Sequence, residues 1–206
     1  MGEGRSAFIV DNRDTDITDK VQGYLKKWCE VSHQFDIATG YFEVGALSRL
    51  DGEWQKLDKI RILMGHEVSR STKETLVTAI TEQLDNSFDE EKEKHGNEFL
   101  RGIPAIIEAI RSGKIECRVY TPHKFHAKMY ITHAKHDIMG PVALVGSSNF
   151  TVPGISKNIE LNVRIETGHQ VVELQEWFEH FWEHEGTEPI NEEVLEVMET
   201  HSQEYE

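Results

Sequence analysis

Short apolar, β-branched runs alternate along this 206-residue chain with segments whose apolar residues recur at helical spacing. This order restricts the fold, because strands that alternate with helices usually build one sheet covered by helices. Strand-like runs lie at residues 8–10, 35–42, 60–64, 115–120 and 142–145, and helical spacing lies at residues 17–28, 44–50, 71–84 and 100–110. The pattern predicts a layered α/β domain.

Residues 125–132 and 159–165 are two further predicted strands. In residues 159–165, apolar residues at odd positions alternate with polar residues at even positions, which predicts one apolar and one polar face. Residues 85–97 carry many charges and almost no apolar side chains. We expect that segment to be a solvated loop or a solvated helix face.

The net charge of −15 is concentrated toward the C-terminus. From residue 170 onward there are twelve Glu and no Lys or Arg, whereas residues 101–169 carry nine basic and five acidic residues. The overall acidity therefore does not exclude a phosphate-bearing substrate. Residues 171–182 have the periodicity of an amphipathic helix. We expect residues 6–169 to form the domain and residues 170–206 to form an acidic helical extension.

Several classes of protein are excluded by composition. No apolar run approaches the roughly 18 residues that a membrane-spanning helix needs, and no basic and then apolar signal segment is seen. Cys29 and Cys117 are too few for a disulfide scaffold or a four-cysteine zinc site. We expect a cytoplasmic protein that does not use a membrane.

His126 and Lys128 stand two residues apart in the predicted strand, so their side chains share one face with Tyr130. An imidazole can attack a phosphorus atom or carry a proton, and an ammonium group can hold a phosphoryl oxygen. The nearby cation also favours the neutral imidazole, which is the nucleophilic form. The pair therefore indicates chemistry on a phosphate ester.

A second polar set follows the last buried run. Gly146 begins a turn that continues through Ser147, Ser148 and Asn149, where backbone N–H groups and side-chain donors can face an oxyanion. Glu160 lies on the polar face of the next predicted strand. A carboxylate there can accept the second imidazole proton and orient a histidine.

Three short motifs thus stand in order, each beside a predicted strand: His126-x-Lys128, Gly146-Ser147-x-Asn149 and Asn158-x-Glu160. The ordered set resembles the phospholipase D superfamily. It is most similar to the nuclease-like branch, which includes the phospholipase D-like domains at the N-termini of some bacterial helicases. Residues 35–42 and 60–65 resemble the opening strands of those domains, so the resemblance covers most of residues 6–166.

The resemblance implies a layered α/β/α domain with a mixed central sheet, followed here by the C-terminal amphipathic helix. It also implies two-step phosphodiester cleavage without a metal or another cofactor. In that scheme His126 is the nucleophile and forms a phosphohistidine, and Glu160 orients it. Lys128 and Asn149, helped by Ser147, stabilise the phosphoryl oxygens. The residues expected to contact the substrate are Ser148, Gly146 and Tyr130.

A second histidine must protonate the leaving oxygen in this family. Members with two motifs supply both histidines in one chain, and members with a single motif supply the second one by dimerising. This chain has one motif. The resemblance therefore implies a homodimer with its site across a two-fold axis, DNA as the substrate, and a helicase domain or subunit as a candidate partner.

One position departs from the family pattern. The family's His-x-Lys is usually followed, after four residues, by Asp, and here that position is His133. If the Asp takes part in catalysis, the activity is in doubt; if it only supports the fold, the loss matters less.

Other functions stay open at this point. A catalytically weak module that binds DNA or a partner, associated with a helicase, is the alternative that His133 favours. A lipid phosphodiesterase lacks the support of a polybasic patch. The histidines also form two His-x-x-His pairs, but positions three apart on a strand face opposite sides, so no metal site is expected.

Overall fold

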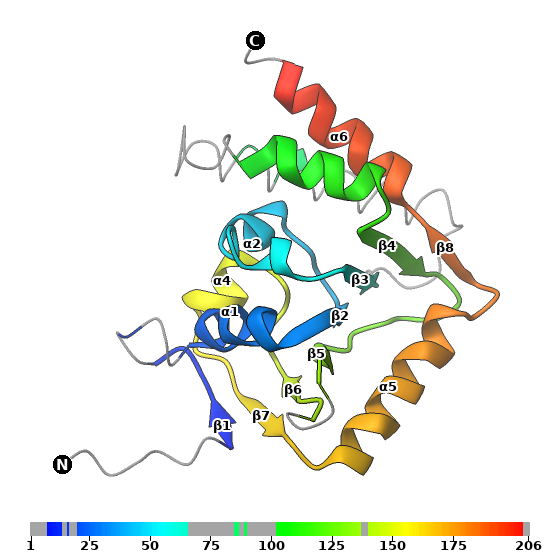
Figure 1. Cartoon of the computed structure of the whole chain (residues 1–206). Helices are drawn as coiled ribbons and strands as arrows, with labels where there is room; N and C mark the ends of the chain where they lie inside the picture. Colours follow the sequence, from blue (N-terminus) through cyan, green and yellow to red (C-terminus); the bar gives the residue numbers. More distant parts are fainter. Residues whose placement is uncertain are drawn as a thin grey trace.

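Within the part of the chain that the computed structural model describes (residues 8–13, 16, 20–65, 85, 86, 89, 102–136 and 140–203), eight strands form one sheet (Figure 1). Their order across the sheet is β1-β7-β6-β5-β2-β3-β4-β8. The strands are β1 (Ile9–Val10), β2 (Ser32–Thr39), β3 (Lys59–Met64), β4 (Ile115–Tyr120), β5 (Met129–Ala134), β6 (Ala143–Gly146), β7 (Asn162–Ile165) and β8 (Thr187–Pro189).

The sheet is mixed. Strand β2 pairs in parallel with β3, and β3 in parallel with β4. The other neighbouring strands are antiparallel, including β2 with β5 and β5 with β6. The layered α/β domain with a mixed central sheet is therefore confirmed.

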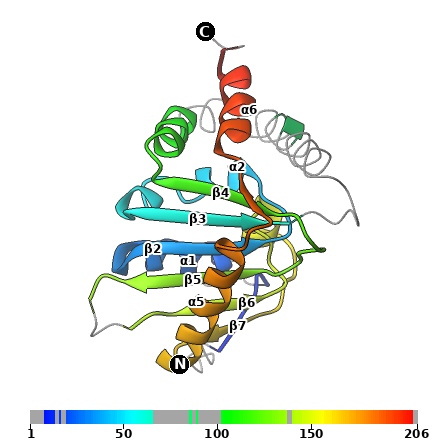
Figure 2. The same ribbon diagram turned by 90° about the vertical axis from the view of Figure 1, so that its right-hand side faces the viewer.

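Helices cover both faces of the sheet (Figure 2). One face carries α1 (Val21–Val31), α2 (Val44–Ser48), the 3-10 helix η2 (Trp54–Lys56), α4 (Val152–Ser156), the helix of residues 102–111 and α6 (Asn191–Gln203). The opposite face is crossed by α5 (Gly168–Trp182).

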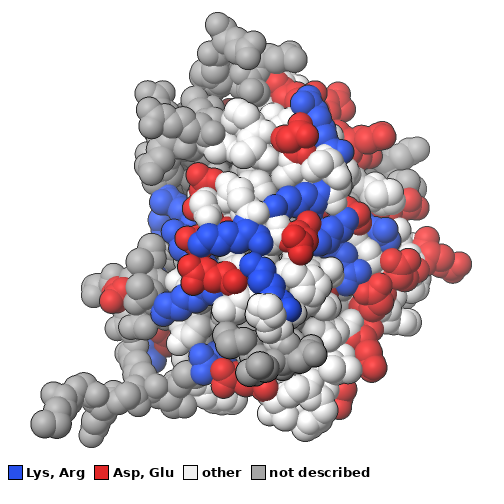
Figure 3. Space-filling view, viewed as in Figure 1, with Lys and Arg blue, Asp and Glu red and all other residues white. Residues whose placement is uncertain are grey.

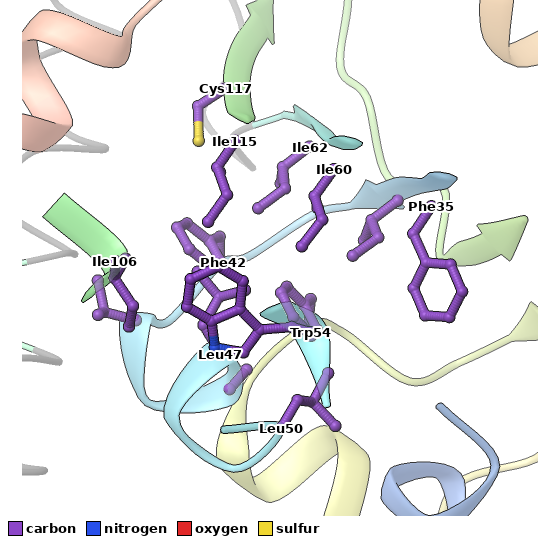
Figure 4. Close-up of a cluster of buried hydrophobic side chains, with 14 of the residues drawn as sticks. Phe35, Phe42, Leu47, Leu50, Trp54, Ile60, Ile62, Ile106, Ile115 and Cys117 are labelled. Carbon is purple, nitrogen blue, oxygen red and sulfur yellow. The ribbon is translucent and has the colours of Figure 1, made fainter. Parts of the chain in front are cut away.

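The larger hydrophobic core lies between the sheet and the first group of helices. Figure 4 shows Ile60, Ile62 and Ile115 of the sheet pointing toward Leu47 and other side chains of the helical layer. Helix α1 joins this core because its larger buried apolar residues share one face of the helix: Val21, Leu25, Trp28 and Cys29. The chain then passes directly from α1 into β2, which fixes the start of the central strand.

The smaller core lies under α5, whose buried residues are Val171, Phe178 and Trp182. This helix confirms the amphipathic pattern predicted for residues 171–182. The following residues do not form an appended extension. Strand β8 pairs with β4, and Val194 and Met198 of α6 are buried in the larger core. Residues 170–203 are therefore part of the domain, because apolar residues on their helices complete both cores.

Two predicted strands begin later than the sequence suggests. Strand β5 begins at Met129 rather than at residue 125, so His126 and Lys128 precede the pleated part of the chain. Strand β7 begins at Asn162, and the segment before it exposes Ile159 by 73% and Leu161 by 61%. The inward position of β7 is Asn162, which is 1% exposed. The predicted apolar face of residues 159–161 is thus wrong, because this segment lies outside the sheet.

The helices predicted for residues 44–50 and 100–110 are observed as α2 and as the helix of residues 102–111. The helix predicted for residues 71–84 lies outside the described residues. So does most of the charge run at residues 85–97, of which the structure describes 85, 86 and 89.

Candidate active site

Three strand ends meet at one edge of the sheet. Strand β2 ends there, whereas the antiparallel β5 begins there, as the pairing of Ala38 with Met129 shows. Strand β6 ends at the same edge, because Val145 pairs with Met129. In Figure 2 this is the right-hand end of β2. The topology therefore gathers the residues after β2, before β5 and after β6, which are distant in sequence.

Gly40 marks the point where these segments converge. A β-carbon at Gly40 would lie 3.1 Å from His126 Cδ2, 3.3 Å from Asn149 Oδ1 and 3.5 Å from Lys128 Nζ. The φ angle of Gly40 lies outside the left-handed region. A larger residue at this position would therefore crowd these side chains, whereas the backbone conformation itself does not call for glycine. The structure thus brings together three residues that the sequence singles out from two separate motifs.

The side chain of Asn149 has a fixed orientation. Its Oδ1 accepts hydrogen bonds from the backbone N–H groups of Gly40 (3.1 Å) and Tyr41 (3.2 Å). Because N–H groups donate, the atom that receives them is the oxygen, and the amide NH2 points away from this turn. Asn149 is only partly buried. Its NH2 is therefore available as a donor to an anion.

Lys128 and His126 lie at the surface of the same edge. His126 is exposed and Lys128 is partly buried. The Lys128 Nζ donates to the backbone oxygen of His126 at 3.1 Å. This bond holds the ammonium group beside the histidine, although the two residues do not lie in a strand.

Ser147 and Glu160 form a second pair beside the site. The Ser147 hydroxyl donates to the Glu160 carboxylate, and the Leu161 N–H donates to Ser147 Oγ at 3.0 Å. The pair links the end of β6 to the segment before β7. Glu160 is expected to orient His126, and the contact that the structure describes for its carboxylate is with Ser147.

Two residues expected to contact the substrate are buried. Ser148 is 0% exposed and Tyr130 is 2% exposed. The Tyr130 hydroxyl donates to the Ser148 backbone oxygen at 3.1 Å, and its ring meets Phe150 edge to face. Burial raises the pKa of Tyr130, and the charge of Glu160 raises it further. Both residues therefore pack beneath the turn, and the expectation that they contact a substrate stays a prediction.

Gly146 is exposed, but its role in the turn is steric. A β-carbon there would lie 2.1 Å from the Leu161 backbone oxygen. Only glycine lets the segment before β7 approach β6 this closely. The neighbouring Asn162 then secures the turn, because its Nδ2 donates to Ser148 Oγ at 2.8 Å and to the Val10 backbone oxygen at 3.2 Å.

His133, which replaces the motif aspartate, lies at the other end of β5. Its Nε2 lies 2.5 Å from Asp36 Oδ2, and Arg61 binds the same carboxylate through two nitrogens at 2.7 and 2.8 Å. Burial alone raises the pKa of Asp36, but the hydrogen bonds and charges of Arg61 and His133 outweigh it and lower the pKa. Arg61 also pairs with Glu179 of α5 at 2.8 Å. The group therefore ties α5 to the sheet.

The motifs do not predict three residues that contribute to the site: Thr39, Gly40 and Asn162. Thr39 and Gly40 end a buried strand with two small residues, and that signal could have marked a place where other segments approach. Asn162 gives no such signal, because an alternating strand does not tell which face is inside.

The end of the parallel strands opposite the candidate site carries basic residues that are paired with acids, as in Lys56 with Glu53 at 2.6 Å and Lys59 with Glu116. Figure 3 shows Lys and Arg interspersed with Asp and Glu on that face. A single-sign surface for a polyanion is therefore not found on this face.

No helix among the described residues is long and apolar enough to cross a bilayer. They also contain no group of three or more His, Cys, Asp or Glu side chains arranged as metal ligands.

Known proteins are similar to this chain in two ways, in fold and through a family model. No curated protein matches the chain in sequence. Among solved structures, phosphatidylserine synthase from Haemophilus influenzae is similar in fold, with a TM-score of 0.53 and 11% identity over 95% of this chain and 44% of that one. NucT from Helicobacter pylori aligns with a TM-score of 0.49 and 10% identity over 85% and 94%. Nuc of the phospholipase D family from Salmonella typhimurium aligns with a TM-score of 0.47 and 14% identity over 82% and 87%.

The family model described as "Cardiolipin synthase, PLD-like domain" matches residues 30–182. The match includes β2, the segment with His126 and Lys128, the turn with Asn149, and α5. It spans most of the chain, so this protein belongs to the phospholipase D-like domain family.

Proposed function

We propose that the protein is a metal-independent phosphodiesterase, specifically a DNA nuclease, that acts through a phosphohistidine intermediate as a homodimer. The observation that carries the proposal is the convergence of His126, Lys128 and Asn149 on the space in front of Gly40. A nucleophile, a cation and an amide donor around one small space are the groups that a phosphoryl centre requires.

In the first step, an imidazole nitrogen of His126 attacks the phosphorus atom. A nitrogen–phosphorus bond forms, the phosphorus–oxygen bond to the leaving nucleoside breaks, and a general acid gives its proton to the departing oxygen. In the second step, water attacks the phosphorus, the nitrogen–phosphorus bond breaks, and the conjugate base of that acid takes the proton from water.

Lys128 and Asn149 stabilise the charge on the non-bridging oxygens in both steps. Lys128 provides a charged donor, held by its bond to the His126 backbone oxygen. Asn149 provides a neutral donor whose orientation is fixed before the substrate arrives. Fixed donors of this kind stabilise a transition state without a cost of reorganisation.

Glu160 and Ser147 complete the proposed site. Glu160 accepts a hydrogen bond from Ser147, so its carboxylate is held at the edge of the site. We assign Glu160 the role of orienting the His126 ring in the complex, with Ser147 keeping the carboxylate in place and assisting at a phosphoryl oxygen.

The general acid is proposed to be the equivalent histidine of a second copy. Two exposed apolar residues, Ile159 and Leu161, flank Glu160 in sequence at the edge of the site. Two exposed apolar side chains this close together beside a site are a candidate protein–protein contact. A homodimer formed over them would place two sites close to one two-fold axis.

A nucleic acid fits this site better than a lipid. His126 and Ser147 are exposed at the edge of a sheet, where a long polymer can reach them. Residues 101–169, which supply most of the site, carry nine basic and five acidic residues in a chain of net charge −15. Cys29 and Cys117 are both free and buried, which fits the reducing cytoplasm where DNA is found.

The test is DNA cleavage in excess EDTA, with single- and double-stranded substrates. Wild-type protein should cleave, and His126→Ala should be slower by at least about 10³-fold. His123→Ala removes an exposed histidine of the same loop and serves as the matched control, with wild-type activity expected.

A requirement for added magnesium would overturn the mechanism. Phosphatidylcholine turnover faster than DNA cleavage would overturn the substrate. DNA binding that is equal in wild type and His126→Ala, without cleavage by either, would replace the nuclease with the binding module associated with a helicase.

A further inference from the structure

The turn of residues 39–41 contacts the side chain of Asn149 through several hydrogen bonds. Gly40 and Tyr41 donate two backbone hydrogen bonds to Asn149 Oδ1. Beyond this point the two segments stay paired: the Glu43 N–H donates to the Phe150 oxygen at 3.1 Å, and Val152 N–H donates to Glu43 Oε2 at 2.9 Å. The segment that follows β2 therefore holds Asn149 in place.

Thr39 links the segment after β2 to the segment that contains Asn149 and Phe150. Its hydroxyl donates to the Tyr41 backbone oxygen at 2.5 Å and accepts from the Phe150 N–H at 2.9 Å. The same oxygen lies 3.3 Å from Asn149 Oδ1. Thr39 and Phe150 are both 0% exposed, so water cannot replace these bonds.

We infer that Thr39 is a positioning residue that fixes the amide orientation of Asn149. The hydroxyl keeps the Gly40 and Tyr41 N–H groups directed at Asn149 Oδ1, which leaves the Asn149 NH2 directed toward the substrate. Without the hydroxyl, the turn and the Phe150 backbone lose their link. The amide can then rotate and present its oxygen, which repels a phosphoryl anion. The inference deepens the proposed function, because the benefit of a fixed NH2 rests on Asn149 binding a phosphoryl oxygen.

The matched variants are Thr39→Val, which keeps the shape and removes the hydroxyl, and Thr39→Ser, which keeps the hydroxyl. We expect Thr39→Val to lower kcat for DNA cleavage by about 10–100-fold with KM changed much less, since a fixed donor acts chiefly in the transition state. Thr39→Ser should stay within about threefold of wild type. Equal losses in both variants would overturn the positioning role.

A second readout does not use activity. The Asn149 side-chain NH2 signals can be assigned in nitrogen-15 NMR spectra by their loss in Asn149→Ala, and followed while inorganic phosphate is added. Wild type and Thr39→Ser should each show one pair of signals that shifts with phosphate. Thr39→Val should show a second or broadened pair and at least a tenfold weaker response. An unchanged Asn149 signal in a folded Thr39→Val would contradict the inference.

A third measurement uses wild-type protein alone, in case Thr39→Val does not fold. Coupling across the hydrogen bond from the Gly40 nitrogen to the Asn149 side-chain carbonyl should be detectable, and its absence would overturn the inference. If this coupling is present but wild type neither cleaves DNA nor binds phosphate, the proposed function fails and the orientation of Asn149 stands.

Discussion

His133 Nε2 lies 2.5 Å from the carboxylate of Asp36. His133 occupies the position where the family pattern has Asp, and the carboxylate at this place comes instead from the neighbouring strand β2. Arg61 binds Asp36 and reaches α5 through Glu179. Although position 133 is His and not Asp, a carboxylate is therefore still present beside it, at the opposite end of β5 from His126. We interpret the replacement as a change in the framework of the fold rather than in the catalytic groups.

The pH dependence of stability tests this interpretation. The pKa of Asp36 is lowered in the fold, so the carboxylate contributes stability above its unfolded pKa of about 3.9, and the contribution is lost as the pH falls through the lower folded value. Asp36→Asn should lower the free energy of unfolding at pH 7 by about 3–5 kcal/mol, since it leaves Arg61 without its buried partner. Urea unfolding from pH 7 to pH 3 measures both quantities. An Asp36→Asn variant as acid-sensitive as wild type would show that Asp36 is not the source of the acid sensitivity.

His133→Asp should also destabilise the protein, although it restores the residue of the family pattern. The new carboxylate would face Asp36, which is 0% exposed, and like charges at this distance repel. We expect a lower melting temperature at pH 7 that recovers in part at pH 4, and a value at pH 7 equal to that of wild type would show that the two side chains do not meet.

Gly40→Ala tests whether the space in front of Gly40 belongs to the active site. The added β-carbon would crowd His126 at 3.1 Å and Asn149 at 3.3 Å. We expect at least a tenfold loss of kcat/KM in a folded protein, because displacement of catalytic groups by a fraction of an ångström is costly. Gly168→Ala is the matched control, since its β-carbon would meet nothing within 4 Å. Equal activity of the two variants would place the reaction elsewhere.

Ile159→Lys tests the proposed dimer. Ile159 is 73% exposed, so the change should leave the fold intact, but a charge at an apolar interface should weaken dimerisation at least tenfold. The dimer fraction measured by sedimentation equilibrium and the rate of DNA cleavage should fall together. The cleavage activity should recover at high protein concentration. Val172→Lys, at a position on α5 that is 44% exposed, should affect neither. A monomeric wild type with full activity would rule out the shared site.

The fold and the main site residues could be predicted for different reasons. Alternating apolar runs predict the sheet and its helices, because burial depends on local periodicity. The motifs that contain His126, Lys128 and Asn149 can be recognised in the sequence without knowledge of the fold, because they combine residue types suited to phosphate chemistry. Tyr130 illustrates the limit: its place depends on the start of β5, which pairing with β2 decides.

Asp36 and Thr39 could not be assigned from sequence for a related reason. Both lie in the strand-like run of residues 35–42, where they look like ordinary members of a buried strand. Their partners, Arg61 and His133 for one and Phe150 for the other, are brought close only by the sheet topology. The roles of buried polar residues follow from long-range contacts, and local patterns do not contain them.

The proposed mechanism requires that His126 form a covalent bond to phosphorus. We would mix wild-type protein with a single-stranded oligonucleotide in EDTA, quench it in alkali, which preserves a nitrogen–phosphorus bond, and map the modified peptide by mass spectrometry. The proposed mechanism predicts a phosphoryl-linked nucleotide fragment on His126 that is absent from His126→Ala. Cleavage of the oligonucleotide with no such adduct at any time in the first turnover, or with an adduct on another residue, would contradict it.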